Sequence, residues 1–132
     1  MTGEAHSLNR RFRVLIAEDS EAIVRSFSYL IASDPSLELA GVADDGLDAL
    51  EKVKVLRADV VLMDNGLPYM DGTEATRRIM GEYPGTVVIG MSGIDDERDA
   101  MLSAGAADFI EKIAAYRKLI PAIKGALKAR GP

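Results

Sequence analysis

The chain has 132 residues, a length that suits one ordinary domain with a real hydrophobic core. Its net charge of −5 argues against nucleic-acid binding through bulk electrostatics, because phosphate backbones attract an excess of Lys and Arg. Cysteine is absent, which excludes disulfides, thiolate metal sites and a cysteine nucleophile. Neither a secretory leader nor an apolar run of membrane-spanning length is found, so we expect a cytoplasmic protein with no membrane partner.

Five short apolar runs predict β-strands. Three of them are rich in Val and Ile without strict alternation, which is typical of strands buried on both faces. In chain order the predicted strands cover residues 12–17, 37–43, 58–63, 86–91 and 107–110.

A helical pattern follows each predicted strand. Four of these segments carry an apolar stripe, whereas the fourth in order has an acidic first turn, a thin apolar face and Gly105 as a stop. Two Asp-Gly pairs, at Asp45 and Asp71, are predicted to be plain turns, and Pro121 fits the last helix only near its first turn or at a kink. The predicted helices cover residues 20–33, 47–56, 75–83, 95–105 and 116–127.

The alternation of strands and helices predicts an α/β fold. With right-handed crossovers, the chain forms a doubly wound five-stranded parallel sheet with helices on both faces. In such a sheet the working site lies beyond the carboxyl ends of the strands. We expect residues 1–11 to be a flexible tail, residues 12–129 to form one domain, and residues 130–132 to be its end or the start of a linker.

Polar residues follow four of the predicted strands at that edge: Glu18 and Asp19, then Asp64, Ser92 and Lys112. Clustered carboxylates repel one another unless a cation joins them, and Lys112 together with an oxygen-bound Mg²⁺ would supply that charge. Asp64 is then a candidate nucleophile toward phosphorus, with Ser92 donating a hydrogen bond. Each residue also has a plainer interpretation as a turn residue, a helix cap or a solvated charge.

The segments LIAEDS, MDNGLPYMDG, MSG and AGAADFIEK resemble the receiver domain of two-component response regulators, over a match from about Phe12 to about Ala129. The resemblance implies a flavodoxin-like strand order 2-1-3-4-5 and a Mg²⁺ cofactor. It implies these metal ligands: Asp19, Asp64, Glu18 partly through water, and the backbone carbonyl of Gly66.

The resemblance also implies roles for the remaining residues. Asp64 becomes the phospho-acceptor, Lys112 and Ser92 its catalytic partners, and Ser92 and Phe109 the switch pair. One departure is Ile113, which stands where the family often has Pro, and we predict a trans Lys112–Ile113 peptide because a non-prolyl cis bond costs about 2.5–4 kcal/mol.

The implied function is that of a signalling phosphoprotein and not of an enzyme. A histidine kinase or histidine phosphotransfer protein donates a phosphoryl group. Phosphorylation then alters the surface formed by helix 95–105, strand 107–110 and helix 116–127. The same surface is a candidate homodimer interface. We expect no direct nucleic-acid binding by this domain. The alternative is the receiver fragment of a DNA-binding transcriptional regulator. A flavodoxin-like or phosphatase enzyme is remote, since EDSEA is too acidic for a flavin phosphate and Gly66 stands where a second acid is needed.

Overall fold

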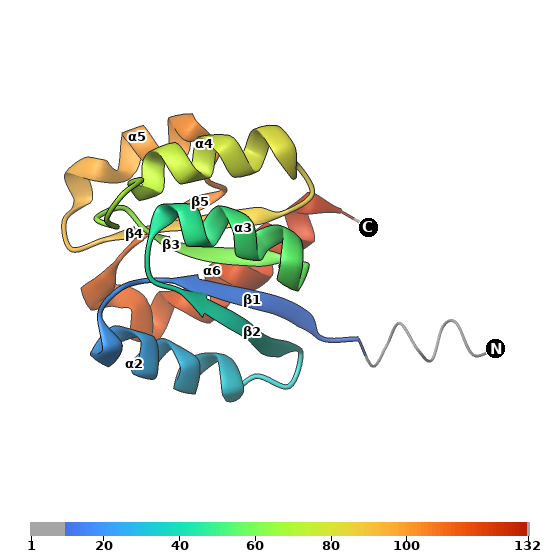
Figure 1. The fold of residues 1–132 in the computed structure, drawn as a ribbon. Helices are drawn as coiled ribbons and strands as arrows, with labels where there is room; N and C mark the ends of the chain where they lie inside the picture. Colours follow the sequence, from blue (N-terminus) through green and yellow to red (C-terminus); the bar gives the residue numbers. More distant parts are fainter. Residues whose placement is uncertain (1–9, 132) are drawn as a thin grey trace.

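The computed structural model describes residues 10–131, so most of the expected tail and Pro132 lie outside the described part. Five parallel strands form one sheet in the order β2-β1-β3-β4-β5, which confirms the predicted fold and strand order (Figure 1). The strands are β1 (Phe12–Ala17), β2 (Leu37–Ala43), β3 (Val60–Asp64), β4 (Val87–Ser92) and β5 (Asp108–Glu111).

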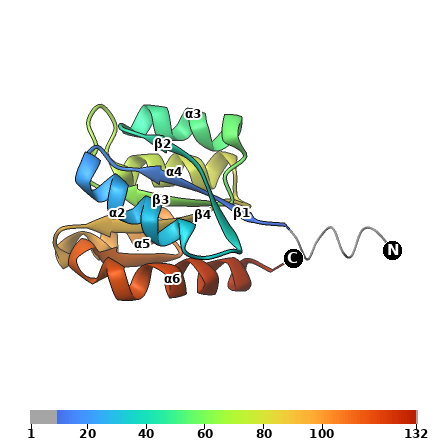
Figure 2. The same cartoon turned by 90° about the horizontal axis from the view of Figure 1, so that it is seen from below.

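Helices cover both faces of the sheet. Helices α2 and α6 lie on one face, and α3, α4 and α5 lie on the other (Figures 1 and 2). The α-helices within residues 10–131 are α2 (Glu21–Ala32), α3 (Gly46–Leu56), α4 (Gly72–Glu82), α5 (Arg98–Ala104) and α6 (Ala115–Arg130). Two short 3₁₀ helices, η1 (Asp95–Glu97) and η2 (Lys112–Ala114), follow β4 and β5. The acidic start of the predicted fourth helix is therefore 3₁₀, and only its later part is α-helical.

The two-residue period of the strands divides the core into two clusters. In β1, Val14 and Ile16 pack beneath α2 and α6, whereas Leu15 and Ala17 face α3 and α4. Every residue of β3 and β4 is buried. These strands lie in the middle of a sheet that is covered on both sides, which explains why their sequences do not alternate.

Side chains outside the helices fix where three of them begin. Ser20 accepts a hydrogen bond from the backbone N–H of Ile23 at the start of α2. Asp45 and Asp71 accept from Asp48 and Glu74 in the same way, at 2.7 and 2.8 Å. The prediction of plain turns at Asp45 and Asp71 was therefore wrong, because both residues are N-caps.

The last three strands begin and end one or two residues later than the sequence pattern indicates. Asp64 and Ser92 are therefore the last residues of β3 and β4, with backbones held in the sheet. Helix α6 runs through Pro121, which lies in its second turn, just beyond the position expected. Gly105 ends α5 in the left-handed conformation with φ 117°, as expected of a C-terminal stop.

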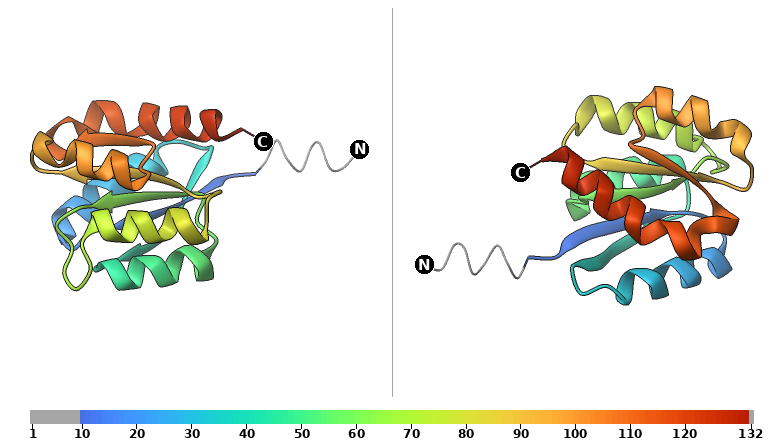
Figure 3. Two further views of the ribbon diagram at one scale, coloured as in Figure 1. Left: turned by 90° about the horizontal axis from the view of Figure 1, so that it is seen from above. Right: turned by 180° about the vertical axis from the view of Figure 1, so that it is seen from behind.

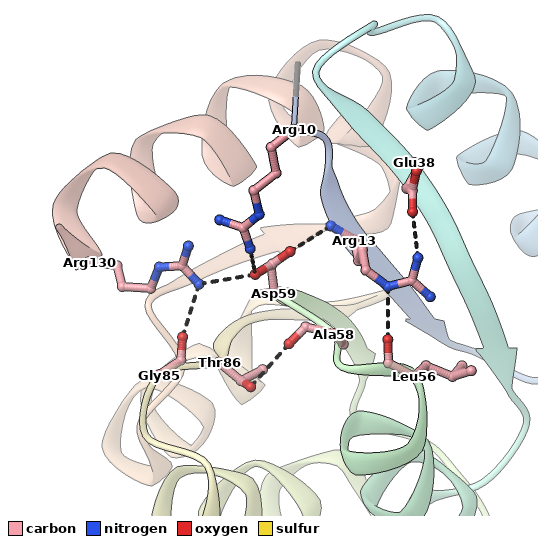
Figure 4. A network of polar contacts seen from close by, with 9 residues as sticks. All are labelled: Arg10, Arg13, Glu38, Leu56, Ala58, Asp59, Gly85, Thr86 and Arg130. Carbon is pink, nitrogen blue, oxygen red and sulfur yellow. Dashed lines mark hydrogen bonds and ion pairs between the residues drawn. The ribbon is translucent and has the colours of Figure 1, made fainter. Parts of the chain in front are cut away.

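A polar network closes the opposite end of the sheet and holds the two described ends of the chain together (Figures 3 and 4). The nearly buried Asp59 accepts hydrogen bonds from the Arg13 backbone and from the Arg10 guanidinium, at 2.8 and 2.9 Å. Arg130, at the end of α6, lies 3.6 Å from the same carboxylate and donates to the Gly85 carbonyl. The Arg10 end of the expected tail is thus paired to the domain.

Candidate functional site

Carboxylates gather at the carboxyl ends of β1 and β3. Glu18 directly follows β1 and its side chain is 1% exposed, while Asp64 ends β3 and is 8% exposed. Asp19 is exposed beside them, and the three residues offer oxygens that all lie within 4.8 Å of one another. Glu18 is oriented by its own chain, since its Oε2 accepts the backbone N–H of Ser20 at 3.0 Å. The predicted convergence of these three carboxylates is confirmed.

Lys112 brings a positive charge to the two buried carboxylates. Its Nζ lies 2.8 Å from Glu18 Oε1 and 2.9 Å from Asp64 Oδ1. Burial lowers the pKa of the Lys112 ammonium, but the contacts with Glu18 and Asp64 outweigh burial and place the pKa above its ordinary value of 10.5. Lys112 is therefore a fixed cation at neutral pH.

The isomer of the peptide bond after Lys112 affects the direction in which the Lys112 side chain points. Within residues 10–131 no peptide bond is cis, so the Lys112–Ile113 bond is trans, which confirms that prediction. The Ile113 side chain that follows is 91% exposed.

The loop after Asp64 returns to the end of β3 at Gly72. Gly72 donates to the Asn65 carbonyl at 3.0 Å, and a Cβ at Gly72 would lie 2.3 Å from the Asp64 carbonyl oxygen, so only glycine fits there. Gly66 is different, because a Cβ there would meet Asp64 Oδ2 at an ordinary 3.6 Å and its φ is not positive. The loop thus leaves space for a side chain at Gly66, next to the outer oxygen of Asp64.

The two predicted switch residues are both buried. Ser92 ends β4 and is 5% exposed, and its hydroxyl donates a hydrogen bond to the Glu97 carboxylate. Phe109 is 3% exposed in the core beneath α4 and α5, with the Arg98 guanidinium 5.1 Å from the centre of its ring. Ser92 therefore stands at the expected strand end, and its proton is engaged by a residue that the sequence did not single out.

Glu97 and Asn65 are two polar residues near the site that the sequence reasoning missed. Asn65 Nδ2 donates to Glu97 Oε2 at 2.6 Å, so one carboxylate joins the loop after β3 to the end of β4. The adjacency of Asn65 to Asp64 was a signal that could have been used. Nothing in the local pattern of Glu97 indicates its partners, which lie far from it in the sequence.

The residues present suit a hard divalent cation. Magnesium prefers a few carboxylate oxygens in a site that also keeps water, and here two carboxylates are buried while Asp19 opens to solvent. Among residues 10–131, Glu18 Oε1 has no well-aligned hydrogen-bond partner, and this buried oxygen makes an ionic contact with Lys112. An oxygen in this condition gains from a second cation, so the donor set fits Mg²⁺.

The sequence profile of the response regulator receiver domain matches residues 14–124. The chain belongs to this family. Members of the family accept phosphoryl groups from histidine kinases and in general bind Mg²⁺. Within the described residues, no helix combines the length and the apolar character that a membrane span requires.

Solved structures with the same fold include other receiver domains. The response regulator domain of Thermotoga maritima CheB is 32% identical, with a TM-score of 0.83 over 90% of this chain and 98% of that chain. The receiver domain of the putative response regulator NarL from Mycobacterium tuberculosis is 27% identical, with a TM-score of 0.85 over the same shares.

Curated relatives carry the name protein-glutamate methylesterase/protein-glutamine glutaminase. One from Myxococcus xanthus is 42% identical over 109 residues, and one from Syntrophus aciditrophicus is 41% identical over 104 residues. These alignments cover 79% and 76% of this chain but 30% of each relative, so the chain spans less than a third of their length. The expectation that the protein is not an enzyme is corrected by this finding, since the relatives that contain a similar receiver domain are named as enzymes.

Proposed function

We propose that this domain takes a phosphoryl group from a histidine kinase or a histidine phosphotransfer protein onto Asp64, in a Mg²⁺-dependent reaction. The observation that carries the proposal is the environment of Asp64 at the end of β3. Its Oδ1 contacts Lys112 at 2.9 Å, and its carboxylate lies with those of Glu18 and Asp19 in one cluster. Residues 12–129 act as one domain in this proposal.

The chemistry is an attack by a carboxylate oxygen of Asp64 on the phosphorus of the donor. A P–O bond forms, the P–N bond to the donor histidine breaks, and the released imidazole nitrogen takes a proton from water. Glu18, Asp19, Asp64 and the Gly66 carbonyl would hold Mg²⁺, which when bound neutralises charge on the transferring phosphoryl group. Lys112 adds a fixed positive charge beside Asp64 Oδ1.

The response to phosphorylation passes through Ser92 and Phe109 in this proposal. The Ser92 hydroxyl turns toward the new phosphoryl oxygens. The packing around Phe109 then adjusts to the space that the Ser92 hydroxyl has left. Phe109 belongs to β5, which lies beside α5 and α6. The surface formed by α5, β5 and α6 is then the one whose partner affinity changes, including affinity for a second copy of the domain.

Small-molecule phosphorylation tests the proposal directly. With acetyl phosphate and Mg²⁺, the protein should gain one phosphate by intact mass, and Asp64→Asn should gain none. The matched control is Asp71→Asn, because Asn caps helices as well as Asp and the residue lies in the same loop. Uptake by Asp64→Asn at the parent's rate would refute the assignment, and so would a parent that takes up no phosphate.

For the output we favour control of a protein-glutamate methylesterase. The support is the identity of 41–42% with relatives of that name and, among solved receiver domains, an identity of 32% with that of CheB against 27% with that of NarL. A DNA-binding transcriptional regulator is the second candidate. The sequence of the complete gene discriminates between them, and release of methanol from methyl-esterified glutamyl peptides by the full-length protein tests the first.

A further inference from the structure

Glu97 forms a bridge between the ends of two strands. Its Oε1 accepts the hydroxyl proton of Ser92 at the end of β4, and its Oε2 accepts from the Asn65 side-chain amide at 2.6 Å. Asn65 directly follows Asp64. The bridge therefore links the residue beside the proposed phospho-acceptor with the proposed switch hydroxyl.

The Asn65 amide is held in one orientation by its other contacts. Its Oδ1 accepts from both the backbone N–H and the hydroxyl of Thr73, at 2.9 and 2.7 Å. Its backbone N–H donates to the Met91 carbonyl at 3.0 Å. Since the carbonyl end is occupied, the NH₂ group faces Glu97, and the carboxylate sits between two donors with fixed positions.

The Glu97 side chain does not cap α5, the helix that follows it. Glu97 stands at the N-cap position of α5, but its side chain makes no capping hydrogen bond there. Its carboxylate instead contacts the two groups across the loop. A role in starting α5 therefore does not explain the contact with Ser92.

A serine hydroxyl has one proton to donate. In this structure the Ser92 hydroxyl donates its proton to Glu97. The Ser92 hydroxyl oxygen in turn accepts a hydrogen bond from the backbone N–H of Ile94 at 3.4 Å. A phosphoryl oxygen on Asp64 would need that proton too. The Glu97 carboxylate and the phosphoryl group are thus competing acceptors, and both are anions, so they also repel each other.

We propose that Glu97 is a latch on the unphosphorylated domain, a positioning residue that acts through Ser92. The inference rests on the proposed function, because it concerns how the Asp64 site switches. Forming the switched state requires Ser92 to leave Glu97, so the bridge raises the free energy of that state. Loss of the Glu97 charge should favour the switched state even before any phosphate is transferred.

The test uses beryllofluoride with Mg²⁺ as a mimic of a carboxylate-bound phosphoryl group, with affinity measured by the change in backbone NMR signals. Glu97→Gln should bind it about tenfold more tightly than the parent, which corresponds to about 1.4 kcal/mol, because a charge-assisted hydrogen bond gives way to a neutral one. The matched control is Asp96→Asn, which removes one charge from an exposed residue of the same 3₁₀ turn. It should change affinity far less.

A double-mutant cycle with Ser92→Ala separates a latch from a general effect. If Glu97 acts through Ser92, the gain from Glu97→Gln in the Ser92→Ala background should fall to the small gain of the charge control Asp96→Asn. Circular dichroism checks folding, and Glu97→Ala, expected to act in the same direction, replaces any Gln variant that does not fold.

Three outcomes overturn the latch. The first is that Glu97→Gln binds beryllofluoride no more tightly than Asp96→Asn does. The second is that the full gain from Glu97→Gln persists in the Ser92→Ala background. In both cases the parent still binds beryllofluoride and takes up phosphate, so the proposed function stands. A parent that does neither refutes the proposed function, and the latch with it.

Discussion

Replacing Lys112 with Met removes the cation that contacts two nearly buried carboxylates and keeps a side chain of similar length. Glu18 and Asp64 are 1% and 8% exposed, and each has one oxygen within 3 Å of the Lys112 ammonium. Removing one partner of a buried ion pair destabilises a protein by about 3–5 kcal/mol. Lys112 is itself 21% exposed and Asp19 opens the site to water, so we expect a smaller loss of about 2–3 kcal/mol in unfolding free energy.

Urea unfolding at neutral pH with a chelator, followed by circular dichroism, measures this loss. For urea m values of about 1–3 kcal/mol per molar, a loss of about 2–3 kcal/mol should lower the midpoint by about 0.7–3 M. Added Mg²⁺ should then stabilise Lys112→Met more than the parent, because no ammonium competes with the metal for the Glu18 and Asp64 oxygens.

The matched control is Lys118→Met, an exposed lysine of α6. It should stay within about 0.5 kcal/mol of the parent, the usual range for surface substitutions. The reasoning fails if Lys112→Met is no less stable than Lys118→Met. It also fails if Mg²⁺ stabilises Lys112→Met and the parent equally.

The pH dependence of the same difference has a definite sign. The pKa of Lys112 is raised by folding, so its contribution is complete below the ordinary value of 10.5 and is lost as the pH rises through the higher folded value. Parent and Lys112→Met should therefore converge in stability only at strongly alkaline pH. Convergence near neutral pH would contradict the assignment of Lys112 as the balancing cation.

Three further predictions concern other residues. Asp19→Asn should raise the stability of the metal-free protein by about 1 kcal/mol in thermal melts and should abolish Mg²⁺-dependent phosphorylation. The carboxylate oxygens lie within 4.8 Å of one another, and two charges at that distance repel by about 0.9 kcal/mol at the dielectric of water and about 3.5 kcal/mol at that of a protein surface. Gly66→Lys should slow the loss of phosphate about fivefold in a decay time course, because a side chain at this position lies beside Asp64 Oδ2. An ion pair between the new ammonium and the phosphoryl group, near the surface, contributes about 1 kcal/mol, which corresponds to about fivefold. The pKa of Asp34 is lowered from 3.8 to about 2 by its bond with Lys124, helped by Ser36, so Asp34→Asn should lose about 1 kcal/mol of stability at neutral pH after screening. The difference should shrink as the pH falls below about 4 and vanish only below about 2.

Each of these has an outcome that would count against it. Normal Mg²⁺-dependent phosphorylation of Asp19→Asn would remove that residue from the site. A folded Gly66→Lys protein that loses phosphate as fast as the parent would show that access past Gly66 does not limit hydrolysis. Urea midpoints of Asp34→Asn and the parent that differ equally at pH 7 and pH 2 would mean that the Asp34 charge is not the source of the difference.

Much of the fold could be predicted from local pattern. Buried parallel strands are apolar on both faces and their connecting helices on one, so the alternation along the chain is visible without any long-range information. The same logic placed Asp64 and Lys112 at one edge, because all strands of a parallel sheet end on the same side. The acidic pair Glu18-Asp19 followed from that rule as well.

Tertiary structure decided the contacts that join distant segments. Asp-Gly looks the same in a turn and at a helix start, and only the N–H groups of the following turn show that Asp45 and Asp71 are caps. The pairing of Arg10 with Asp59 and the bridge from Glu97 to Asn65 join residues 49 and 32 positions apart. Hydrogen bonds of this kind depend on how whole helices and strands pack, and they leave no periodic signal in the chain. The sequence by itself therefore determined where the reactive groups stand. Only the tertiary structure decided which partner holds the Ser92 hydroxyl.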